Sequence, residues 1–348
     1  MTTGGPILSV RDLKTYFFPD EGVVRAVDGA SFDIYPGKTL GVVGESGCGK
    51  SVTARSILNL VEEPGRIVSG QIVLHNGYGS IEITKLRPDG HAMRSIRGGT
   101  IAYVFQEPMT SFSPVHTIGN QIMEAILFHQ RVPKKEARAR GIDLLRQVGI
   151  PRAADRMDEY AFQLSGGLRQ RAMIATALAC DPKLLIADEP TTALDVTTQA
   201  QILQLLRELQ AQNGMAIMLI THNLGVVAEM CDDVVVMYLG KVVEEGSVDD
   251  LFFNPKHPYT QALLRSIATL SDEPRSRLPT ISGSVPHPYN RPAGCPFNPR
   301  CPSFMPGTCD AFEPRLLGTG HGQAVSCFLY HQPDPADAVG AEVAVRGG

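Results

Sequence analysis

One short segment has the residue types and spacing of a phosphate-binding loop. Residues 44–51 read Gly-Glu-Ser-Gly-Cys-Gly-Lys-Ser, which matches the pattern G-x-x-x-x-G-K-[ST]. Glycines at these positions let backbone N–H groups turn toward phosphate oxygens, and a following helix N-terminus adds positive potential. Lys50 is expected to reach the β- and γ-phosphates of a nucleotide, and the Ser51 hydroxyl to bind Mg²⁺. The predicted nucleotide-binding residues are Gly44, Glu45, Ser46, Gly47, Cys48, Gly49, Lys50, Ser51 and Val52.

A second segment ends in two adjacent acids. The apolar run Leu184–Ala187 is followed by Asp188 and Glu189. Strands of a parallel sheet deliver their C-terminal residues to the ligand crevice. We therefore expect Asp188 to hold Mg²⁺ through water and Glu189 to act as a general base on an attacking water. The alternative is a strand that ends in a solvated acidic turn, but the upstream phosphate loop favours the catalytic interpretation.

These residues need an α/β scaffold to position them. In residues 1–250, short apolar runs bounded by turn or cap residues alternate with helical patterns. Such runs are typical of strands that are buried on both faces of a sheet. Strands are predicted at Thr39–Val43, Thr100–Phe105, Leu184–Ala187, Ala216–Ile220 and Val234–Met237, and helices at Ser51–Leu60 and Val196–Gln212. The phosphate loop then lies between a strand and a helix, as its motif requires.

Two further regions depart from this alternation. Residues from about 115 to 170 are amphipathic and helical, with Ile118, Ile122 and Ile126 at helical spacing, a helix at Ala137–Val148 and a helix start at Pro151. We predict a helical subdomain inserted into a core of residues 1–250. Residues 251–348 hold 14 of the 25 prolines and four of the seven cysteines, which predicts a separate extension over 251–333 and a frayed tail over 334–348.

Length, charge and hydropathy exclude several classes of protein. The 348 residues suggest about two domains, and a net charge of −4, from 32 basic and 36 acidic residues, excludes a protein that coats nucleic acid. No apolar stretch approaches the length of a membrane span, and Met1–Ile7 has no secretory signal pattern. We expect a protein in the cytosol or bound to the cytosolic side of a membrane. The basic residues Lys134, Lys135, Arg138 and Arg140 are interpreted as a solvated helix face, with lipid headgroups or a partner as the alternative.

A third motif carries a family resemblance. Leu164-Ser165-Gly166-Gly167-Leu168-Arg169-Gln170-Arg171 resembles the signature sequence of ABC transporter ATPases. Ser165 is expected to cap the following helix, and the two glycines leave its N-terminal amides bare for an anion. The resemblance implies that Ser165, Gly166, Gly167 and Gln170 cover the γ-phosphate of ATP bound to a partner subunit, so that two ATP molecules lie in a head-to-tail dimer.

The resemblance implies roles for single residues as well. Gln106 would join the sheet to the helical subdomain and sense Mg²⁺ and water, and His222 would contact the γ-phosphate. Asp195 would communicate across the dimer, and Phe17 would stack on adenine, with Tyr16 as the neighbouring candidate. Taken singly, these side chains are ordinary strand-end or packing residues. Their joint order favours the functional interpretation, and since every motif position is filled we predict an active ATPase.

Three segments narrow the resemblance to one branch. Residues 106–119, 257–264 and 283–302 resemble the dipeptide and oligopeptide importer ATPases, although residues 111–114 read Ser-Phe-Ser-Pro where many relatives have leucine and asparagine in the middle. The resemblance covers about residues 6–332. It implies a peripheral ATPase on the cytoplasmic face of the inner membrane that energises peptide import. Its partners would be a second ABC ATPase (a paralogue or another copy), two transmembrane permease subunits and an extracytoplasmic peptide-binding protein, with no nucleic acid.

Alternative functions remain open at this point. The same type of ATPase serves nickel and glutathione importers, and cargo is selected by subunits that this chain does not contain. A soluble ABC protein acting on ribosomes or DNA is disfavoured by the single phosphate loop and the lack of sustained heptads. An iron–sulfur redox sensor that uses the ATPase fold as a scaffold is disfavoured by the complete set of catalytic residues.

Four cysteines are clustered in the extension. Cys295, Cys301, Cys309 and Cys327 have the spacing C-x5-C-x7-C-x17-C. Disulfides are rare in the cytosol, so these thiols suggest a metal site. Structural zinc usually shows tight C-x2-C pairs, whereas irregular spacing with adjacent prolines favours an iron–sulfur cluster, and the importer resemblance implies a [4Fe–4S] cluster there. Zn²⁺ and free thiols are the alternatives, and Cys48, Cys180 and Cys231 are predicted to be packing residues.

Overall fold

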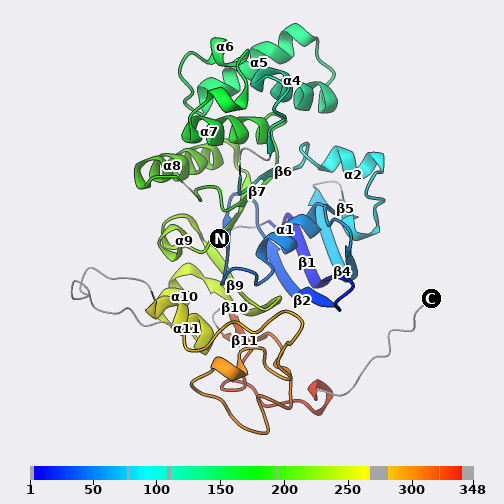
Figure 1. The fold of residues 1–348 in the computed structure, drawn as a ribbon, viewed down its shortest axis with the longest axis vertical. Coiled ribbons are helices and arrows are strands. Elements are labelled where there is room, and N and C mark those ends of the chain that lie inside the picture. Colours follow the sequence, from blue (N-terminus) through cyan, green and yellow to red (C-terminus); the bar gives the residue numbers. More distant parts are fainter. Residues whose placement is uncertain are drawn as a thin grey trace.

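The computed structural model describes residues 4–76, 79–107, 111–192, 194–266, 281–320 and 322–338. Figure 1 shows these residues in three levels along the long axis of the molecule. A group of helices lies at one end, two sheets lie in the middle, and a segment with little regular structure lies at the other end. We call α4–α7, residues 118–177, the helical group, and residues 281–320 and 322–338 the C-terminal lobe.

The larger sheet forms the centre of the molecule. Its order is β11-β12-β10-β9-β3-β8-β7-β6, with parallel pairing from β9 to β6 and antiparallel pairing from β9 to β11. The strands are β3 (Thr39–Val43), β6 (Ile101–Val104), β7 (Leu184–Asp188), β8 (Ala216–Ile220), β9 (Asp233–Tyr238), β10 (Lys241–Ser247), β11 (Leu317–Gly320) and β12 (Gln323–Val325). Every residue of β3, β7 and β8 is buried, as expected for central strands covered on both faces.

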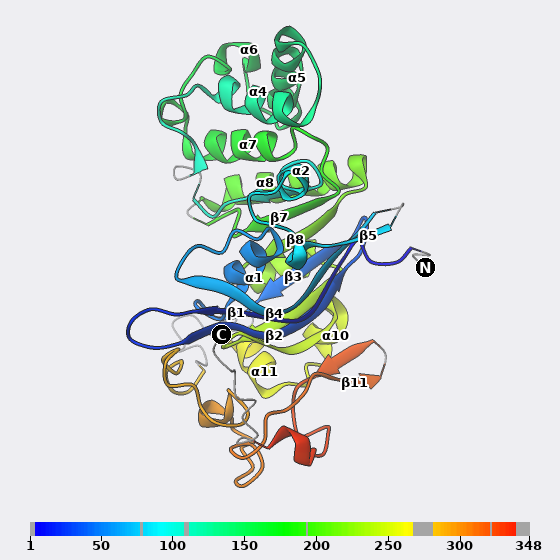
Figure 2. The same ribbon diagram turned by 90° about the vertical axis from the view of Figure 1, so that its right-hand side faces the viewer.

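The smaller sheet is antiparallel and lies beside the larger one. Its order is β2-β1-β4-β5, and Figure 2 shows β1, β2 and β4 running side by side across the molecule. The strands are β1 (Leu8–Phe17), β2 (Val24–Ile34), β4 (Gly65–Asn76) and β5 (Gly79–Glu82). Apolar residues of β1, β2 and β4 share one buried cluster with β3, β8 and the helix that follows β3, so the two sheets have a common core.

The helices cover the sheets and form the helical group. They are α1 (Lys50–Ile57), α2 (His91–Ile96), α4 (Ile118–His129), α5 (Lys134–Gln147), α6 (Ala153–Arg156), α7 (Gly166–Ala177), α8 (Val196–Asn213), α9 (Leu224–Met230), α10 (Val248–Phe253) and α11 (Pro258–Arg265). The buried faces of α4, α5 and α7 share a core with α8 and with β6–β8. Among the described residues, no helix is both long enough and apolar enough to cross a lipid bilayer.

The predicted elements agree with the structure to within a few residues at their ends. β3 and β8 have the predicted bounds, and α8 ends one residue later than predicted because Gly214 adopts the left-handed conformation and stops the helix. The helix start predicted at Pro151 is wrong. Arg152 has φ 51°, a left-handed backbone that interrupts any helix begun at Pro151, and α6 begins at Ala153.

The C-terminal lobe packs against the edge of the larger sheet. β12 pairs with β10, and Tyr238, Tyr259 and Phe297 lie together in a buried cluster that joins β9, α11 and the lobe. Of the tail predicted over 334–348, residues 334–338 include a short 3₁₀ turn at Pro335–Asp337, which is held by a hydrogen bond from Arg315 Nε to Asp337 Oδ1 (2.6 Å). Residues 339–348 lie outside the described residues.

A buried acid fastens the extension to β10. The Glu244 side chain is fully buried, and its carboxylate accepts hydrogen bonds from the backbone N–H groups of Lys256 (2.6 Å) and His257 (2.9 Å) and from Gln323 Nε2 (2.9 Å). Burial raises the pKa of this carboxyl, and the hydrogen bonds from the extension act against that rise. Glu244 therefore links the start of α11 and the C-terminal lobe to β10 of the larger sheet.

We expect Glu244→Gln to lower the free energy of unfolding by about 2 kcal/mol. Both carboxylate oxygens of Glu244 accept from N–H groups, and the amide NH₂ of glutamine would face one of these donors without being able to accept from it. Urea unfolding of the full chain, followed by circular dichroism, measures the change. The matched control is Glu245→Gln, since Glu245 is half-buried and its carboxylate accepts no hydrogen bond from the described residues. Equal losses for both variants would contradict the role given to Glu244.

Candidate nucleotide-binding site

The phosphate loop connects β3 to α1, and its shape requires glycine at two positions. Gly44 has φ 149° and Gly49 has φ 102°, both in the region that disfavours other residues. A Cβ atom on Gly44 would lie 2.2 Å from the carbonyl oxygen of Met237, and one on Gly49 would lie 2.2 Å from that of Ala26. The loop is therefore pressed against β2 and β9, and only glycine fits at these two contacts.

The side chain of Lys50 folds back onto the phosphate loop that precedes it. Its side chain is buried, and Nζ donates hydrogen bonds to the carbonyl oxygens of Gly44 (2.8 Å) and Glu45 (3.1 Å). A phosphate oxygen is a stronger acceptor for an ammonium group than a neutral carbonyl is. The lysine is thus held at the loop by weak partners that a phosphate would replace.

Asp188 is shared between Ser51 and a tyrosine. Ser51 Oγ donates a hydrogen bond to Asp188 Oδ1 (3.0 Å), and the Tyr103 hydroxyl donates one to Asp188 Oδ2 (2.7 Å). Burial and the adjacent carboxylate both raise the pKa of Tyr103, so it stays a donor. The structure therefore brings together Ser51 and Asp188, two of the three residues predicted at the Mg²⁺; the third, Gln106, bonds to the neighbouring Glu189. Tyr103 was not among the predicted residues, because a tyrosine in a buried strand has no distinguishing spacing.

Glu189 is held by three side chains from different parts of the fold. Gln106 Nε2 and Thr192 Oγ1 donate hydrogen bonds to Glu189 Oε2 at 3.0 and 2.8 Å, and His222 Nδ1 lies 3.3 Å from Oε1. The backbone of Glu189 has φ 46°, a strained conformation for a residue other than glycine and one that often marks a functional site. The predicted catalytic residues Glu189, Gln106 and His222 thus form one cluster.

The signature residues lie apart from this cluster. Ser165 is exposed and caps α7, since its Oγ accepts a hydrogen bond from Leu168 N (3.4 Å), and Gly166 is exposed beside it. No hydrogen bond or ion pair among the described residues joins this segment to the phosphate loop. Gln170 is only 2% exposed, so its side chain is buried, unlike Ser165 and Gly166.

Asp195 and the start of α8 lie next to the signature segment. Asp195 accepts hydrogen bonds from Thr198 N (3.0 Å) and Thr198 Oγ1 (2.7 Å), and these bonds lower the pKa of its carboxyl. A Cβ atom on Gly167 would lie 2.8 Å from Thr198 Cγ2, so the first turns of α7 and α8 are in close contact. Ser165 and Asp195 therefore belong to one exposed region of the surface.

The two aromatic candidates for adenine have different surroundings. The Tyr16 hydroxyl donates a hydrogen bond to Asp28 Oδ1 (2.6 Å), which fixes it to β2. Phe17 is half-buried at the end of β1, with its ring against Gly65, where a Cβ atom would lie 2.6 Å from Phe17 Cε1. Tyr16 is thus already engaged within the protein, and Phe17 remains the predicted adenine contact.

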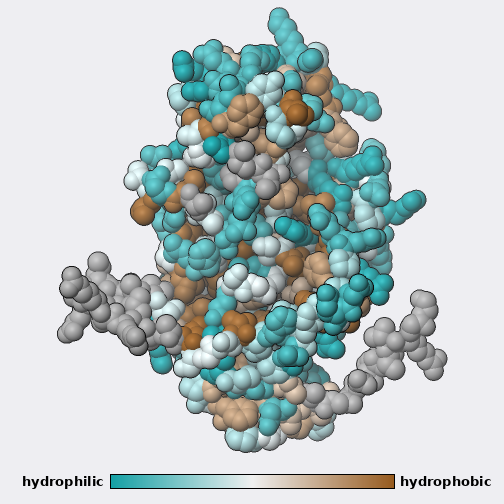
Figure 3. Space-filling view, viewed as in Figure 1, coloured by the Kyte–Doolittle hydropathy of each residue, from teal (hydrophilic) through white to brown (hydrophobic). Residues whose placement is uncertain are grey.

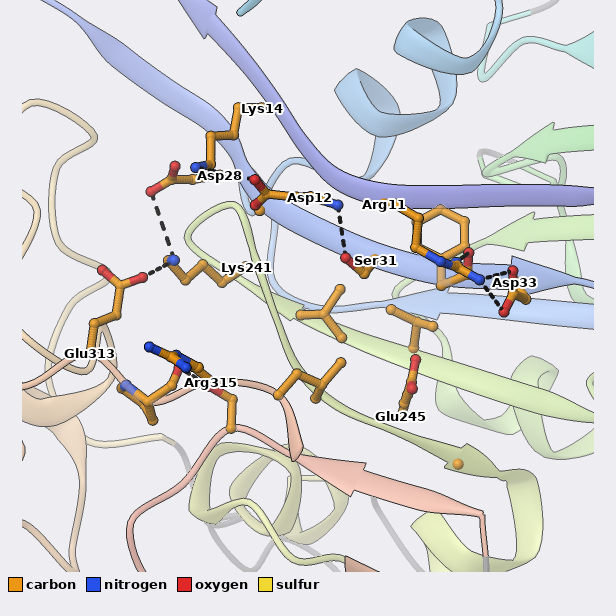
Figure 4. A pocket seen from close by; sticks show the side chains of 18 of the residues that line it. Arg11, Asp12, Lys14, Asp28, Ser31, Asp33, Lys241, Glu245, Glu313 and Arg315 are labelled. Atoms are coloured by element: carbon orange, nitrogen blue, oxygen red, sulfur yellow. Dashed lines mark hydrogen bonds and ion pairs between the residues drawn. The ribbon is translucent and has the colours of Figure 1, made fainter. Parts of the chain in front are cut away.

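A charged groove of about 1840 Å³ lies between β1, β2, β10 and the C-terminal lobe, and none of its lining residues belongs to the phosphate loop (Figure 4). Its central cation, Lys241, forms ion pairs with Asp28 and Glu313, and Arg291 pairs with Asp28 at 2.6 Å. Burial lowers the pKa of Lys241 to about 8. These ion pairs connect the lobe to the core: Arg291 of the lobe pairs with Asp28 on β2, and Glu313 of the lobe pairs with Lys241 on β10.

The four clustered cysteines all lie in the C-terminal lobe as free thiols. Cys295 and Cys309 are buried, Cys301 and Cys327 are half-buried, and Cys295 N donates a hydrogen bond to Cys309 O (2.8 Å). The pKa of Cys295 is raised to about 12, mainly by burial, and the other three cysteines act in the same direction. Yet the described residues contain no group of three or more His, Cys, Asp or Glu side chains close enough to hold a metal ion. This arrangement does not support the metal site that the cysteine spacing predicts. The spacing of cysteines in the sequence does not determine whether their side chains point toward one another.

Comparisons with known proteins agree with this geometry. Residues 27–192 match the ABC transporter family, and residues 243–309 match the oligopeptide/dipeptide transporter C-terminal region. The chain is 50% identical over 327 residues to the oligopeptide transport ATP-binding protein AppD of Bacillus subtilis (strain 168), covering 94% of this chain and 97% of that protein. It is 48% identical over 321 residues to the dipeptide transport ATP-binding protein DppD of Escherichia coli (strain K12), covering 92% of this chain and 96% of that protein.

A solved structure has the same nucleotide-binding fold. The dimeric post-hydrolysis state of the ATP-binding cassette MJ0796 with ADP and Pi matches with a TM-score of 0.61 and 26% identity. The match covers 69% of this chain and 98% of that cassette, so the unmatched part of this chain is additional to the cassette fold. With relatives of more than 45% identity over nearly the whole length, the chain belongs to the ABC transporter ATP-binding proteins, in the family of oligopeptide and dipeptide transport ATPases.

Proposed function

We propose that this chain is the peripheral ATPase subunit of a binding-protein-dependent importer for dipeptides and oligopeptides. The observation that carries the proposal is the match of residues 243–309 to the oligopeptide/dipeptide transporter C-terminal region, downstream of an ABC transporter match. Whole-length similarity to peptide transport ATP-binding proteins supports it. The subunit would act at the cytoplasmic face of the inner membrane.

The cluster around Glu189 supports a mechanism of ATP hydrolysis. Lys50 and the backbone N–H groups of the loop would bind the phosphates, and Ser51 and Asp188 would hold Mg²⁺. When bound, Mg²⁺ neutralises charge on the phosphate oxygens. Glu189 would accept a proton from the attacking water, whose oxygen then bonds to the γ-phosphorus as the bond to ADP breaks. Gln106 and His222 touch the Glu189 carboxylate and would orient it and the water.

The exposed signature region supports a head-to-tail pair of ATPases. Ser165 and Gly166 lie at the surface beside Asp195, and Val196, the next residue, is 85% exposed. Ser165, Gly166 and Gly167 would cover ATP held by the phosphate loop of a second ABC ATPase, either a paralogue or another copy of this chain.

The helical group would couple the ATPase to the permease subunits. It presents large apolar side chains to solvent, including Phe128 (61% exposed) and Phe162 (58% exposed), and Val115 just before it is 75% exposed. Figure 3 shows that most of the surrounding surface on its face is hydrophilic, with small hydrophobic areas between. ATP binding would close the ATPase pair and hydrolysis would reopen it, with the work supplied by the different affinities of the two states for ATP.

The other candidate functions have less support. A nickel or glutathione importer would use the same ATP chemistry, but the relatives reported above are named as oligopeptide and dipeptide transport proteins. A soluble ABC protein acting on ribosomes or DNA would have no use for a C-terminal region of the peptide transporter type. Cargo would be selected by the extracytoplasmic binding protein.

Glu189→Gln tests the catalytic base. We expect ATP binding to change by less than about twofold and hydrolysis by the assembled transporter to fall about a thousandfold, because the amide cannot accept the proton. Nucleotide titration and phosphate release measure the two quantities, with Glu208→Gln, an exposed acid on α8, as the control. Turnover at the wild-type rate would exclude Glu189 as the base.

Purification from membranes tests the transporter assignment. We expect the tagged chain, extracted in mild detergent, to retain two multi-pass membrane proteins and a second ABC ATPase, all identified by mass spectrometry. Lys50→Ala provides a control, since loss of ATP binding should weaken closure but not attachment to the membrane subunits. Recovery of ribosomal or DNA-bound material without membrane subunits would overturn the proposal.

We propose further that Cys295, Cys301, Cys309 and Cys327 hold a [4Fe–4S] cluster, with a Zn²⁺ ion as the alternative. Thiolates are the donors that such clusters use, which supports the proposal, but the four side chains would have to move closer together to hold one, since no three of them are close enough in the described structure. The lobe lies on the far side of β9 and β10 from the helical group (Figure 1). The cluster would therefore serve folding or docking of the lobe, and no step of ATP hydrolysis depends on it.

Anaerobic purification tests the cluster. We expect a broad visible absorbance with equal amounts of iron and inorganic sulfide, and loss of both in Cys301→Ser. Cys180→Ser, which changes a half-buried thiol outside the lobe, should keep them. Zinc at one per chain without iron would replace the cluster by a zinc site, and absence of both metals would leave free thiols.

A further inference from the structure

Two residues from the C-terminal part of the chain hold the second residue of the phosphate loop. The Arg300 guanidinium donates hydrogen bonds from Nη1 to Glu45 Oε2 (2.7 Å) and from Nη2 to Oε1 (3.0 Å), a two-pronged ion pair. The backbone N–H of Glu45 donates to the Tyr259 hydroxyl at 2.8 Å. Both the charge and the backbone of Glu45 are thus fixed by residues more than 200 positions later in the chain.

The two holding residues are themselves rigidly placed. Tyr259 is fully buried, and its ring lies 4.7 Å from that of Tyr238 and 5.4 Å from that of Phe297. The Arg300 side chain is 4% exposed, lies over the Tyr238 ring and donates from Nε to Ser282 O (3.1 Å). The pair to Glu45 raises the pKa of Arg300, so its charge is permanent. Glu45 therefore meets a preformed surface.

These contacts bear directly on the loop. Glu45 O accepts a hydrogen bond from Lys50 Nζ, so the residue held by the lobe also holds the lysine. An unpaired carboxylate beside bound phosphates would repel them, and its guanidinium partner removes that repulsion. The Tyr259 hydroxyl keeps the peptide of Glu45 in one orientation, which spares the loop part of the ordering cost of binding.

We propose that Arg300 and Tyr259 are positioning residues for ATP, through which the C-terminal part of the chain sets nucleotide affinity at the phosphate loop. The inference rests on the proposed assignment of this loop to ATP binding. Arg300 acts by neutralising and orienting Glu45, and Tyr259 acts by fixing its backbone. Their proposed effect on ATP passes through Glu45.

The simpler reading is that Arg300 only fastens the lobe to the core. Arg291 provides the comparison, because it is another arginine of the lobe that is mostly buried and that pairs with an acid of the core. Its Nη1 donates to Asp28 Oδ2 at 2.6 Å on β2, and no hydrogen bond or ion pair joins it to a described residue of the phosphate loop. A fastening role predicts the same effect for both arginines, whereas positioning predicts an effect on ATP for Arg300 alone.

Binding of Mg²⁺-ATP to the purified full chain, measured by calorimetric titration, tests the proposal. We expect Arg300→Gln to raise the dissociation constant about tenfold and Arg291→Gln to change it less than about twofold. The double variant Glu45→Gln/Arg300→Gln should recover most of the lost affinity, because no unpaired carboxylate remains. Tyr259→Phe removes one hydroxyl, keeps the ring packing and should raise the dissociation constant about threefold.

Each outcome decides between the alternatives. Equal effects of Arg300→Gln and Arg291→Gln, or no recovery in the double variant, would overturn positioning by charge. Lys50→Ala separates this inference from the assignment of the loop. Normal binding in Lys50→Ala would refute the loop assignment itself, and weak binding there with normal binding in Arg300→Gln and Tyr259→Phe would refute only the positioning role. If Arg300→Gln is insoluble, Tyr259→Phe carries the test.

Discussion

The parallel register of β3, β8 and β7 is the constraint on which the site depends. Val42 of β3 is paired with Ile220 of β8, and Ile220 is paired with Asp188 of β7. Chain segments that leave these strands must therefore emerge at the same edge of the sheet. That edge receives the phosphate loop from β3, Glu189 from β7 and His222 from β8, so one set of backbone hydrogen bonds brings together three segments that are distant in the sequence. The side chains of these segments are then close enough to form direct hydrogen bonds, as Ser51 does with Asp188.

The C-terminal lobe is joined to the nucleotide-binding part by contacts between its own polar side chains and three acids of the core. Asp28 on β2 is paired with Arg291, Glu45 in the phosphate loop with Arg300, and Glu244 on β10 accepts from Gln323. A carboxylate that loses its partner while still buried is strongly destabilising. Separating the lobe from the core would therefore leave these acids without those partners. In this chain, the phosphate loop is contacted by Arg300 and Tyr259, which come from the C-terminal part of the sequence.

The sequence could predict what depends on local patterns and on motif order. The strands Thr39–Val43 and Ala216–Ile220 were predicted to the residue, because each is an uninterrupted apolar run with a turn or cap at both ends. Pairs between distant side chains left no such pattern. Tyr103 and Asp188 are 85 positions apart and Arg300 and Glu45 are 255 apart, and nothing in the spacing of a tyrosine or an arginine reveals its partner. The cysteines show the same limit, since their clustering in sequence does not define how their sulfur atoms are arranged.

Glu189 is bonded both to the larger sheet and to the segment that leads into the helical group. Its backbone is tied to β8 by the hydrogen bond from Glu189 N to Ile220 O (2.9 Å), while its carboxylate accepts from Gln106, which follows β6 and precedes the helical group. A rotation of the helical group would move Gln106 while β8 holds Glu189 in place, so the hydrogen bond at the carboxylate would lengthen or break. Under the proposed mechanism, docking of the helical group on a permease thereby controls how the base is oriented. The strained φ of Glu189 fits this arrangement, because a residue held from two sides by separate parts of the fold keeps a conformation that neither part alone would impose.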